Sequence, residues 1–190
     1  MRLHRALYES MLIHTDAYRS AKFHNHSFGF RPNRSTEHAK AMMHRMINLQ
    51  SLHFVVDIDI KGFFDNVDHG KLLKQIWTMG IQDKKLLCII SAMLKAEIVG
   101  VGIPSKGTPQ GGILSPLLSN IVLNELDWWV SDQWESFETS RLYTGWNKYR
   151  ALRQGTKLKE CYVIRYADDC APRRRNSDDR NCRVKLRHAV

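Results

Sequence analysis

The sequence predicts an α+β fold in which two short strands, each ending in acidic residues, are surrounded by helices. Apolar side chains dominate residues 53–60 and Cys161–Tyr166, as is typical of strands. Elsewhere apolar residues recur at helical spacing, and helices and strands do not alternate as they do in βαβ units. With 190 residues and a hydrophobic content of 43%, the chain can form one domain, or one large domain split into two lobes.

The N-terminal quarter predicts helices joined by a loop. Residues 2–22 place apolar side chains at near-helical spacing. His, Asn, Gly and Pro are frequent in Phe23–Arg34, which indicates a loop. Ser35 or a neighbour is suited to cap a helix that ends near Asn48. The buried stripe of this helix is predicted to consist of Met42, Met43, Met46 and Ile47.

The strand at residues 53–60 precedes a helical region. Apolar residues are adjacent in this strand rather than alternating with polar ones, so both of its faces are expected to be covered. Two helices are predicted near residues 69–79 and 83–95, with Gly80 between them.

A glycine-rich loop and a long helix follow. Gly100–Gly112 contains five glycines and two prolines, which predicts a loop. Pro116 suits the first turn of a helix that continues to about Trp134. Residues 136–158 mix Ser, Thr, Gly and Asn with Arg and Lys, which predicts a basic surface excursion before the second strand.

The chain is strongly basic, and the excess charge lies toward its C-terminal end. The formal net charge is +10. Residues 1–140 hold 15 Lys+Arg against 14 Asp+Glu (net +1), whereas residues 141–190 hold 14 against 5 (net +9). Such an excess predicts a polyanionic partner, nucleic acid before an anionic membrane surface.

The sequence predicts a cytoplasmic protein that does not span a membrane. No apolar run reaches the roughly 18–20 residues that cross a bilayer, and the N-terminal residues do not predict a signal peptide. The four cysteines form no CxxC pair, so they are expected to be free thiols in a reducing compartment; they are Cys88, Cys161, Cys170 and Cys182.

Acidic residues cluster at the ends of both strands. Asp57, Asp59 and Asp65 lie at the end of the first strand, and Asp168-Asp169 lies at the end of the second. Carboxylates at the mouth of a buried strand are costly unless a cation compensates them. Hard oxygen ligands suit Mg²⁺, and two Mg²⁺ ions about 3.5–4 Å apart are the usual device for in-line phosphoryl transfer. The sequence therefore predicts a metal site if the two strand ends meet.

Four motifs, in order over roughly residues 20–170, carry a resemblance to a known family. Tyr166-Ala167-Asp168-Asp169 resembles the YADD box of reverse transcriptases. Phe54–Leu73, which contains DIKGFFDNVDH, resembles the first catalytic motif of group II intron-encoded reverse transcriptases, also called maturases. Gly107–Asn120 resembles their next box, and Ser27–Ser35 resembles the preceding fingers motif.

The resemblance implies a reverse-transcriptase palm, a small antiparallel sheet backed by helices, with a partial helical fingers region. It implies that Asp59, Asp168 and Asp169 are catalytic and bind two Mg²⁺ ions together with the backbone carbonyl of Ile60. Asp57 and Asp65 do not match a ligand position and are expected to be structural, with Asp65 a hydrogen-bonding or capping group.

Other positions imply contacts with substrate. Phe64 matches the aromatic residue that crowds the 2′ position of an incoming nucleotide and so favours dNTPs over rNTPs. Gln110 matches a residue beside that nucleotide, and the glycines around it, Gly111 among them, let the backbone approach the substrate closely. Contacts with template or primer phosphates are expected from Arg31, Arg34 and Lys61.

The resemblance also predicts a domain division: partial fingers at residues 1–52, a palm at 53–172 with a basic insertion at 136–158, and a basic tail at 173–190. In the family, an apolar return strand, a thumb and a maturase domain follow the YADD box. After Asp169 this sequence is neither apolar nor strand-like, and Pro172 argues against a central strand. A truncated or frameshifted reading frame with a disordered tail is therefore expected.

The expected function is that of an RNA-directed DNA polymerase of a group II intron, with a further role in intron splicing and mobility. The implied partners are an intron RNA template, a DNA primer or target, and dNTPs. The alternatives are a catalytically inactive remnant that binds RNA through residues 141–190, a nonfunctional decay product of a mobile element, and a retron-type polymerase. The last is less favoured because Ser27–Ser35 and Gly107–Asn120 fit the group II enzymes better.

Overall fold

A computed structural model of the chain describes residues 23–50, 52, 54–56, 58, 60–98, 100, 102–109, 112, 114–143, 145–170, 173 and 174. The predicted helix at residues 2–22 lies outside them. The chain divides into two compact units. Unit 1 contains Ile60–Asn124, and unit 2 contains Asn25–Asp59 and Glu125–Lys185, as far as these stretches are described.

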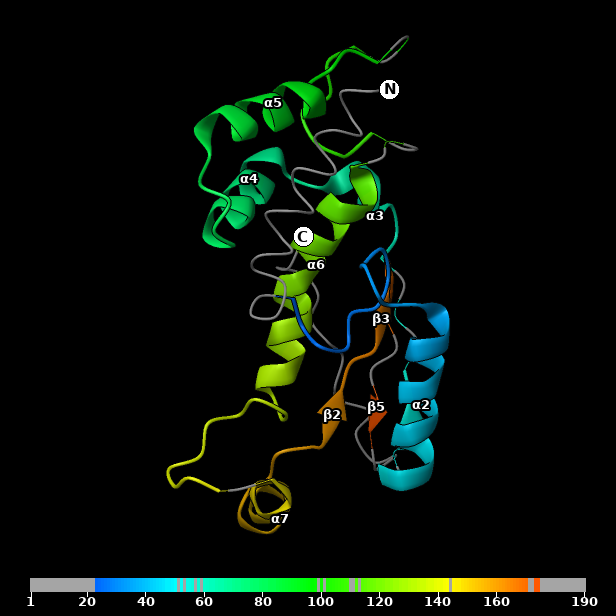
Figure 1. Cartoon of the computed structure of the whole chain (residues 1–190), viewed down its shortest axis with the longest axis vertical. Coiled ribbons are helices and arrows are strands. Elements are labelled where there is room, and N and C mark those ends of the chain that lie inside the picture. The colour runs from blue at the N-terminus through cyan, green and yellow to red at the C-terminus, as the bar shows by residue number, and fades with distance from the viewer. Residues whose placement is uncertain are drawn as a thin grey trace. The chain divides into compact units, whose positions relative to one another are not determined.

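Helix α2 (Thr36–Gln50) packs on the core of unit 2 and runs beside strand β3 (Figure 1). Ser35 Oγ accepts a long hydrogen bond, 3.4 Å, from the backbone N–H of His38, so the predicted capping residue is confirmed. Met46 is buried, and Met42 and Met43 pack against the core as predicted. The buried core of unit 2 comprises Phe28, Ala39, Met46, Leu52, Trp134, Leu152, Tyr162 and Ile164.

Three short strands form an antiparallel sheet in unit 2, in the order β1-β5-β2. They are β1 (Phe54–Val55), β2 (Cys161–Tyr162) and β5 (Arg173–Arg174). The central strand β5 pairs with β1 on one side and with β2 on the other. This arrangement confirms a small antiparallel sheet with helices beside it.

Two predictions about these strands are wrong. Strand β1 is not covered on both faces, because Phe54 is 41% exposed and Val55 is 49% exposed; it is an edge strand, so its adjacent apolar residues do not indicate burial. A strand does follow Pro172, since Arg173–Arg174 occupies the centre of the sheet. Strand pairing uses backbone N–H and C=O groups, which two consecutive arginines supply as well as apolar residues do.

The predicted strand at Cys161–Tyr166 is divided between two sheets. Its first two residues form β2, whereas Arg165–Tyr166 forms β3, which pairs antiparallel with β4 (Asp169–Cys170). Main-chain hydrogen bonds of 2.9 and 3.0 Å join Arg165 of β3 to Phe28 and His26.

Helix α6 (Ser115–Asp132) confirms the predicted long helix, and the boundary between the units falls within it. Helix α7 (Trp146–Gly155) was not predicted, because its basic composition indicated only a surface excursion. Leu152 is buried, and the ring of Tyr149 stacks on Trp134 with centroids 6.1 Å apart. This stretch therefore contributes to the core of unit 2. No helix in the described part of the chain is long and apolar enough to cross a membrane.

In unit 1, helices α4 (His69–Thr78) and α5 (Lys84–Leu94) pack against each other (Figure 1). Both were predicted, as was the break at Gly80, which has a φ of 100°. Asp68 caps α4 and Asp83 caps α5, accepting hydrogen bonds of 2.6 and 2.8 Å from N–H groups of the first turns. A four-residue helix, α3 (Phe63–Asn66), precedes them.

Candidate active site

The Asp168-Asp169 pair lies at the tip of the β3–β4 hairpin in unit 2. Tyr166 pairs with Asp169, so Ala167 and Asp168 form a two-residue turn. Ala167 has a φ of 59°, which two-residue hairpins require at their first position but which residues other than glycine rarely adopt. Asp168 is half-buried and Asp169 is exposed. The turn therefore presents two adjacent carboxylates.

The Ser27–Ser35 motif packs against this turn. Phe28 N–H donates to the carbonyl of Arg165 at 2.9 Å, and a parallel bridge joins Ser27 to Arg165. Gly29 faces the turn so closely that a Cβ there would lie 2.2 Å from the backbone nitrogen of Ala167. Only glycine fits this position, because the atom that a side chain would meet belongs to the backbone.

In unit 1, the Gly107–Asn120 motif meets the part of the Phe54–Leu73 motif that follows Asp59. The Thr108 N–H donates to the carbonyl of Phe64 at 2.7 Å. The buried His69 contributes its Nε2, which lies 2.6 Å from the Gly107 carbonyl oxygen and donates to it. Gly107 has a φ of 94°, and a Cβ there would lie 3.1 Å from the carbonyl oxygen of Phe64. The loop that leads to Gln110 is thus fixed against the segment that carries Phe64.

Three predicted site residues lie near the start of this segment. The carbonyl of Ile60 accepts a 3.2 Å hydrogen bond from Phe63 N–H, which leaves its second lone pair for another partner. Lys61 is exposed. The half-buried ring of Phe64 packs edge-on against the buried ring of Phe63, with centroids 5.4 Å apart. Part of the Phe64 ring therefore remains accessible to a ligand.

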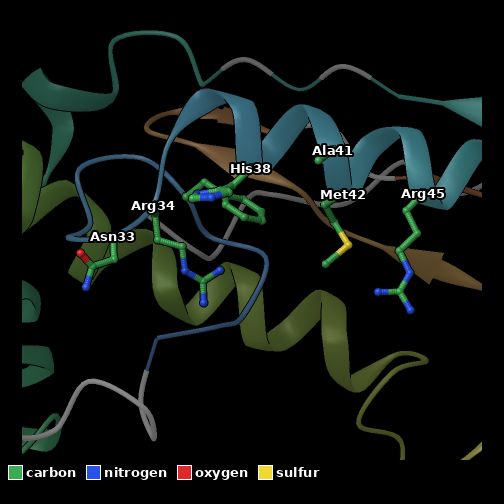
Figure 2. A pocket seen from close by; sticks show the side chains of 7 residues that line it. Asn33, Arg34, His38, Ala41, Met42 and Arg45 are labelled. Carbon is green, nitrogen blue, oxygen red and sulfur yellow. The ribbon is translucent and has the colours of Figure 1, made fainter.

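A basic pocket of about 410 Å³ lies along one face of α2 (Figure 2). Arg34, Met42 and Arg45 extend toward the same side (Figure 2). The guanidinium of Arg34 lies 5.2 Å from the ring centre of Phe28, within cation–π range. Two guanidinium groups around one pocket suit a phosphate group. The lining residues are Phe28, Asn33, Arg34, His38, Ala41, Met42 and Arg45.

The two predicted phosphate-binding arginines of this region differ in their surroundings. Both donate to backbone carbonyls of their own loop, Arg31 Nη1 to Ser27 at 2.9 Å and Arg34 Nη1 to Asn25 at 2.5 Å, but only Arg34 also lines the pocket. Arg45 was not predicted as a site residue. Its spacing could have predicted this position, because His38 and Arg45 lie seven residues apart and therefore on the same face of the helix.

Sequence reasoning also missed Arg165 and Asp127, a fully buried ion pair in unit 2. The Nη2 of Arg165 lies 2.8 Å from Oδ2 of Asp127. Each of these residues is a charged residue inside an apolar segment. Because buried charges need partners, this pattern could have indicated that the two residues pair.

Some predicted site residues lie outside the described residues: Asp59, Gln110 and Gly111. Their roles stay predictions. The described ones are divided between the units, with Asp168, Asp169 and Arg31 in unit 2 and Ile60, Lys61 and Phe64 in unit 1.

Residues 3–182 match the protein family described as reverse transcriptase (RNA-dependent DNA polymerase). The chain belongs to this family. Protein YkfC of Escherichia coli strain K12 is 32% identical to the chain over 182 residues, which cover 87% of the chain and 46% of YkfC. The group II intron-encoded protein LtrA of Lactococcus lactis subsp. cremoris is 40% identical over 129 residues, 66% of the chain and 21% of LtrA. The chain thus spans less than half the length of either relative.

A solved structure supports the fold. Apo telomerase from Candida tropicalis, truncated from the C-terminal domain, superimposes with a TM-score of 0.52 and 15% identity, covering 93% of the chain and 34% of that protein.

A putative COX1/OXI3 intron 1 protein of Saccharomyces cerevisiae is 30% identical over 65% of the chain and 15% of that protein. The predicted reverse-transcriptase fold and the relationship to group II intron reverse transcriptases are confirmed.

Proposed function

We propose that this chain provides the palm and part of the fingers of a group II intron reverse transcriptase, which adds deoxynucleotides to a primer 3′-end on an RNA template. The observation that carries the proposal is the β3–β4 hairpin, which presents Asp168 in its two-residue turn and Asp169 at the start of β4, in a chain of the reverse transcriptase family. Such a turn places two hard oxygen donors beside each other, as a metal-dependent nucleotidyl transfer requires.

Asp59, Asp168 and Asp169 are proposed to hold two Mg²⁺ ions, together with the carbonyl of Ile60. The donor set fits, because carboxylate and carbonyl oxygens are the ligands that Mg²⁺ prefers. The Asp168 and Asp169 carboxylates form no ion pair or side-chain hydrogen bond within the part of the chain that the structure describes. When bound, Mg²⁺ supplies activation of the primer 3′-hydroxyl and stabilisation of the leaving pyrophosphate.

The remaining residues act on the nucleotide. Phe64, whose ring packs edge-on against that of Phe63, is proposed to exclude a 2′-hydroxyl and so to select dNTPs. Gln110 and Gly111 are proposed to flank the same nucleotide. The hydrogen bond from Thr108 to the Phe64 carbonyl supports this, because it keeps the loop before Gln110 near Phe64.

The nucleic acids are proposed to bind through phosphate contacts. Arg31 and Lys61 are candidates from the sequence, and the pocket on α2 adds Arg34 and Arg45. The net charge of +10 supports a polyanionic partner. We propose intron RNA as the template, a DNA target as the primer, a further role in intron splicing, and a cytoplasmic location.

The deciding experiment is primer extension on an RNA template with Mg²⁺ and dNTPs, comparing the parent chain with Asp168→Asn. The parent should extend the primer, and the variant should not, because it loses one negative oxygen donor without a change in side-chain volume. Glu97→Gln, an exposed change outside the four motifs, is the matched control and should behave as the parent does.

RNA binding is measured on the same proteins at several salt concentrations. Asp168→Asn should retain salt-sensitive RNA binding, since the electrostatic contacts are unchanged. Extension by neither parent nor variant, from folded protein that still binds RNA, would favour the inactive RNA-binding remnant. Equal extension by both would show that Asp168 is not a catalytic ligand.

A further inference from the structure

The turn that carries Asp168 and Asp169 is attached to α6 by a buried ion pair. The side chains of Arg165, the first residue of β3, and Asp127 on α6 have no exposed surface. Arg165 Nε donates to both carboxylate oxygens of Asp127 at 2.9 Å, and Nη2 donates to Oδ2 at 2.8 Å. Because removing two charges from water is costly, such a pair is weak evidence for stability and points to a role in specifying geometry.

The same guanidinium binds two further segments. Nη2 of Arg165 donates to Ser27 Oγ at 2.8 Å, and Nη1 donates to the carbonyl oxygen of Ala167 at 2.7 Å. This carbonyl belongs to the planar peptide unit between Ala167 and Asp168. The hydrogen bond therefore restrains the plane of the peptide that leads into Asp168, and so limits the directions in which the Asp168 side chain can leave the backbone.

The turn requires such support because of its backbone conformation. A non-glycine residue such as Ala167, with a φ of 59°, keeps this conformation only where its surroundings impose it. Gly29 lies against the amide side of Ala167, and Arg165 holds the carbonyl side. The two contacts together leave the turn little freedom.

We propose that Arg165 and Asp127 are positioning residues that orient the carboxylates of Asp168 and Asp169 toward bound metal. This inference rests on the proposed function, since it takes these carboxylates as metal ligands. Arg165 acts through the Ala167–Asp168 peptide and needs no contact with substrate. A planar guanidinium reaches a carboxylate, a hydroxyl and a carbonyl at once, whereas the single ammonium of lysine does not.

The test is a Mn²⁺ titration of the full chain, followed by water proton relaxation, for the parent and Arg165→Lys. The variant keeps a positive charge beside Asp127 but loses the fork geometry. We expect it to bind Mn²⁺ about 10- to 100-fold more weakly, as is typical when a partner of a ligand is changed. The Mg²⁺ concentration for half-maximal primer extension should rise in parallel, with KM for primer–template unchanged.

Arg153→Lys is the matched control. Arg153 forms a two-bond ion pair with Glu160 in the same unit, with distances of 3.0 and 2.7 Å, and has no contact with the turn in the described residues. Because Arg153 is 32% exposed and Arg165 is fully buried, the unfolding free energy of both variants is measured as well, and a general loss of stability would make Mn²⁺ affinity follow it in both. We expect a loss of Mn²⁺ affinity beyond the loss of stability in Arg165→Lys alone.

The Mn²⁺ affinities of Arg165→Lys and Asp168→Asn distinguish a failure of the positioning role from a failure of the proposed function. A folded Arg165→Lys protein with the parent's Mn²⁺ affinity overturns the positioning role. If Asp168→Asn also keeps that affinity, the metal site itself is wrong, and with it the proposed function.

A second variant covers the case in which circular dichroism shows Arg165→Lys to be unfolded. Ser27→Ala removes one acceptor of the guanidinium but leaves the pair with Asp127, so it is expected to weaken Mn²⁺ binding about threefold, the effect of one lost hydrogen bond. A folded Ser27→Ala protein with the parent's affinity then overturns the inference.

Discussion

The β3–β4 turn of unit 2 and the loop at Gly107 and Thr108 in unit 1 both carry motif residues, but they are held in different ways. The turn depends on a side chain, because the guanidinium of Arg165 binds the Ala167 carbonyl and is itself held by Asp127. The loop is held without an ion pair in the described residues: Thr108 N–H donates to the Phe64 carbonyl, the His69 side chain donates to the Gly107 carbonyl, and Gly107 packs closely against Phe64. Both segments need a glycine at a close contact, Gly29 against the turn and Gly107 in the loop, but only the turn also depends on a buried ion pair among the described residues.

The largest effect is expected from Asp127→Ala, which leaves the Arg165 guanidinium buried without a counter-charge. Breaking such a pair typically lowers the free energy of unfolding by about 3–5 kcal/mol. Urea denaturation followed by circular dichroism measures it. The double variant Asp127→Leu with Arg165→Met should lose much less, because it buries no charge. Equal losses in single and double variants would contradict the role of the uncompensated charge.

Gly29→Ala tests the close packing of the turn from the other side. Its Cβ would lie 2.2 Å from a backbone nitrogen, so the two segments must move apart. Overpacking of this kind costs about 1–3 kcal/mol, and primer extension should fall with it, because Ala167 precedes Asp168. Unchanged denaturation midpoint and activity would show that the loop moves away without affecting the turn.

Gly107→Ala probes the loop of unit 1. Alanine pays about 1–2 kcal/mol for the left-handed conformation, and its Cβ also crowds the carbonyl of Phe64 at 3.1 Å. Gly102→Ala is the control, since Gly102 has a φ of 89° but nothing within 4 Å of the added carbon. A larger loss of unfolding free energy at Gly107 measures the crowding alone, and equal losses would rule the crowding out.

The smallest effect is expected from Tyr162→Phe. The Trp134 Nε1–H donates to the Tyr162 hydroxyl oxygen at 3.2 Å in the core, so the variant should lose about 1 kcal/mol at neutral pH. Burial raises the pKa of Tyr162 in the folded state above its ordinary value of about 10. The stabilisation that the Tyr162 hydroxyl contributes to the parent is therefore fully present below pH 10, and it is lost as the pH rises above 10.

The variant is checked by urea denaturation across that range. Above pH 10 the unfolding free energy of the parent should fall more steeply with pH than that of Tyr162→Phe, because phenylalanine has no proton to release. Parallel slopes would contradict the assigned cause.

Local sequence signals predicted the elements that depend on local contacts. Helices α2, α4, α5 and α6 follow from apolar spacing and caps, as Ser35 and Asp83 show. The Asp168-Asp169 turn followed from two adjacent carboxylates after an apolar run. Helix α7 was not predicted. Most of its residues are charged or polar, so the two that pack on the core, Tyr149 and Leu152, gave no clear helical pattern.

Contacts between segments that are distant in the sequence could not be predicted from local sequence patterns. The Arg165 guanidinium brings together Asp127 and Ser27, which lie 38 and 138 positions away in the chain. No spacing rule connects three such positions. For the same reason β5 was missed: its side chains do not indicate a strand, and its position follows from the free edges of β1 and β2.

The central position of β5 bears on the order of folding during synthesis. Phe54 pairs with Arg174, 120 positions later in the chain (174 − 54), whereas α4 and α5 are neighbours in sequence. Contacts between distant residues form slowly, and a ribosome delivers the N-terminal partner first. The helices of unit 1 can therefore pack while β1 is still unpaired, with Phe54 and Val55 exposed on an open strand edge. Because β1 has only two residues, this open edge is short, which limits pairing with other chains until residue 174 arrives.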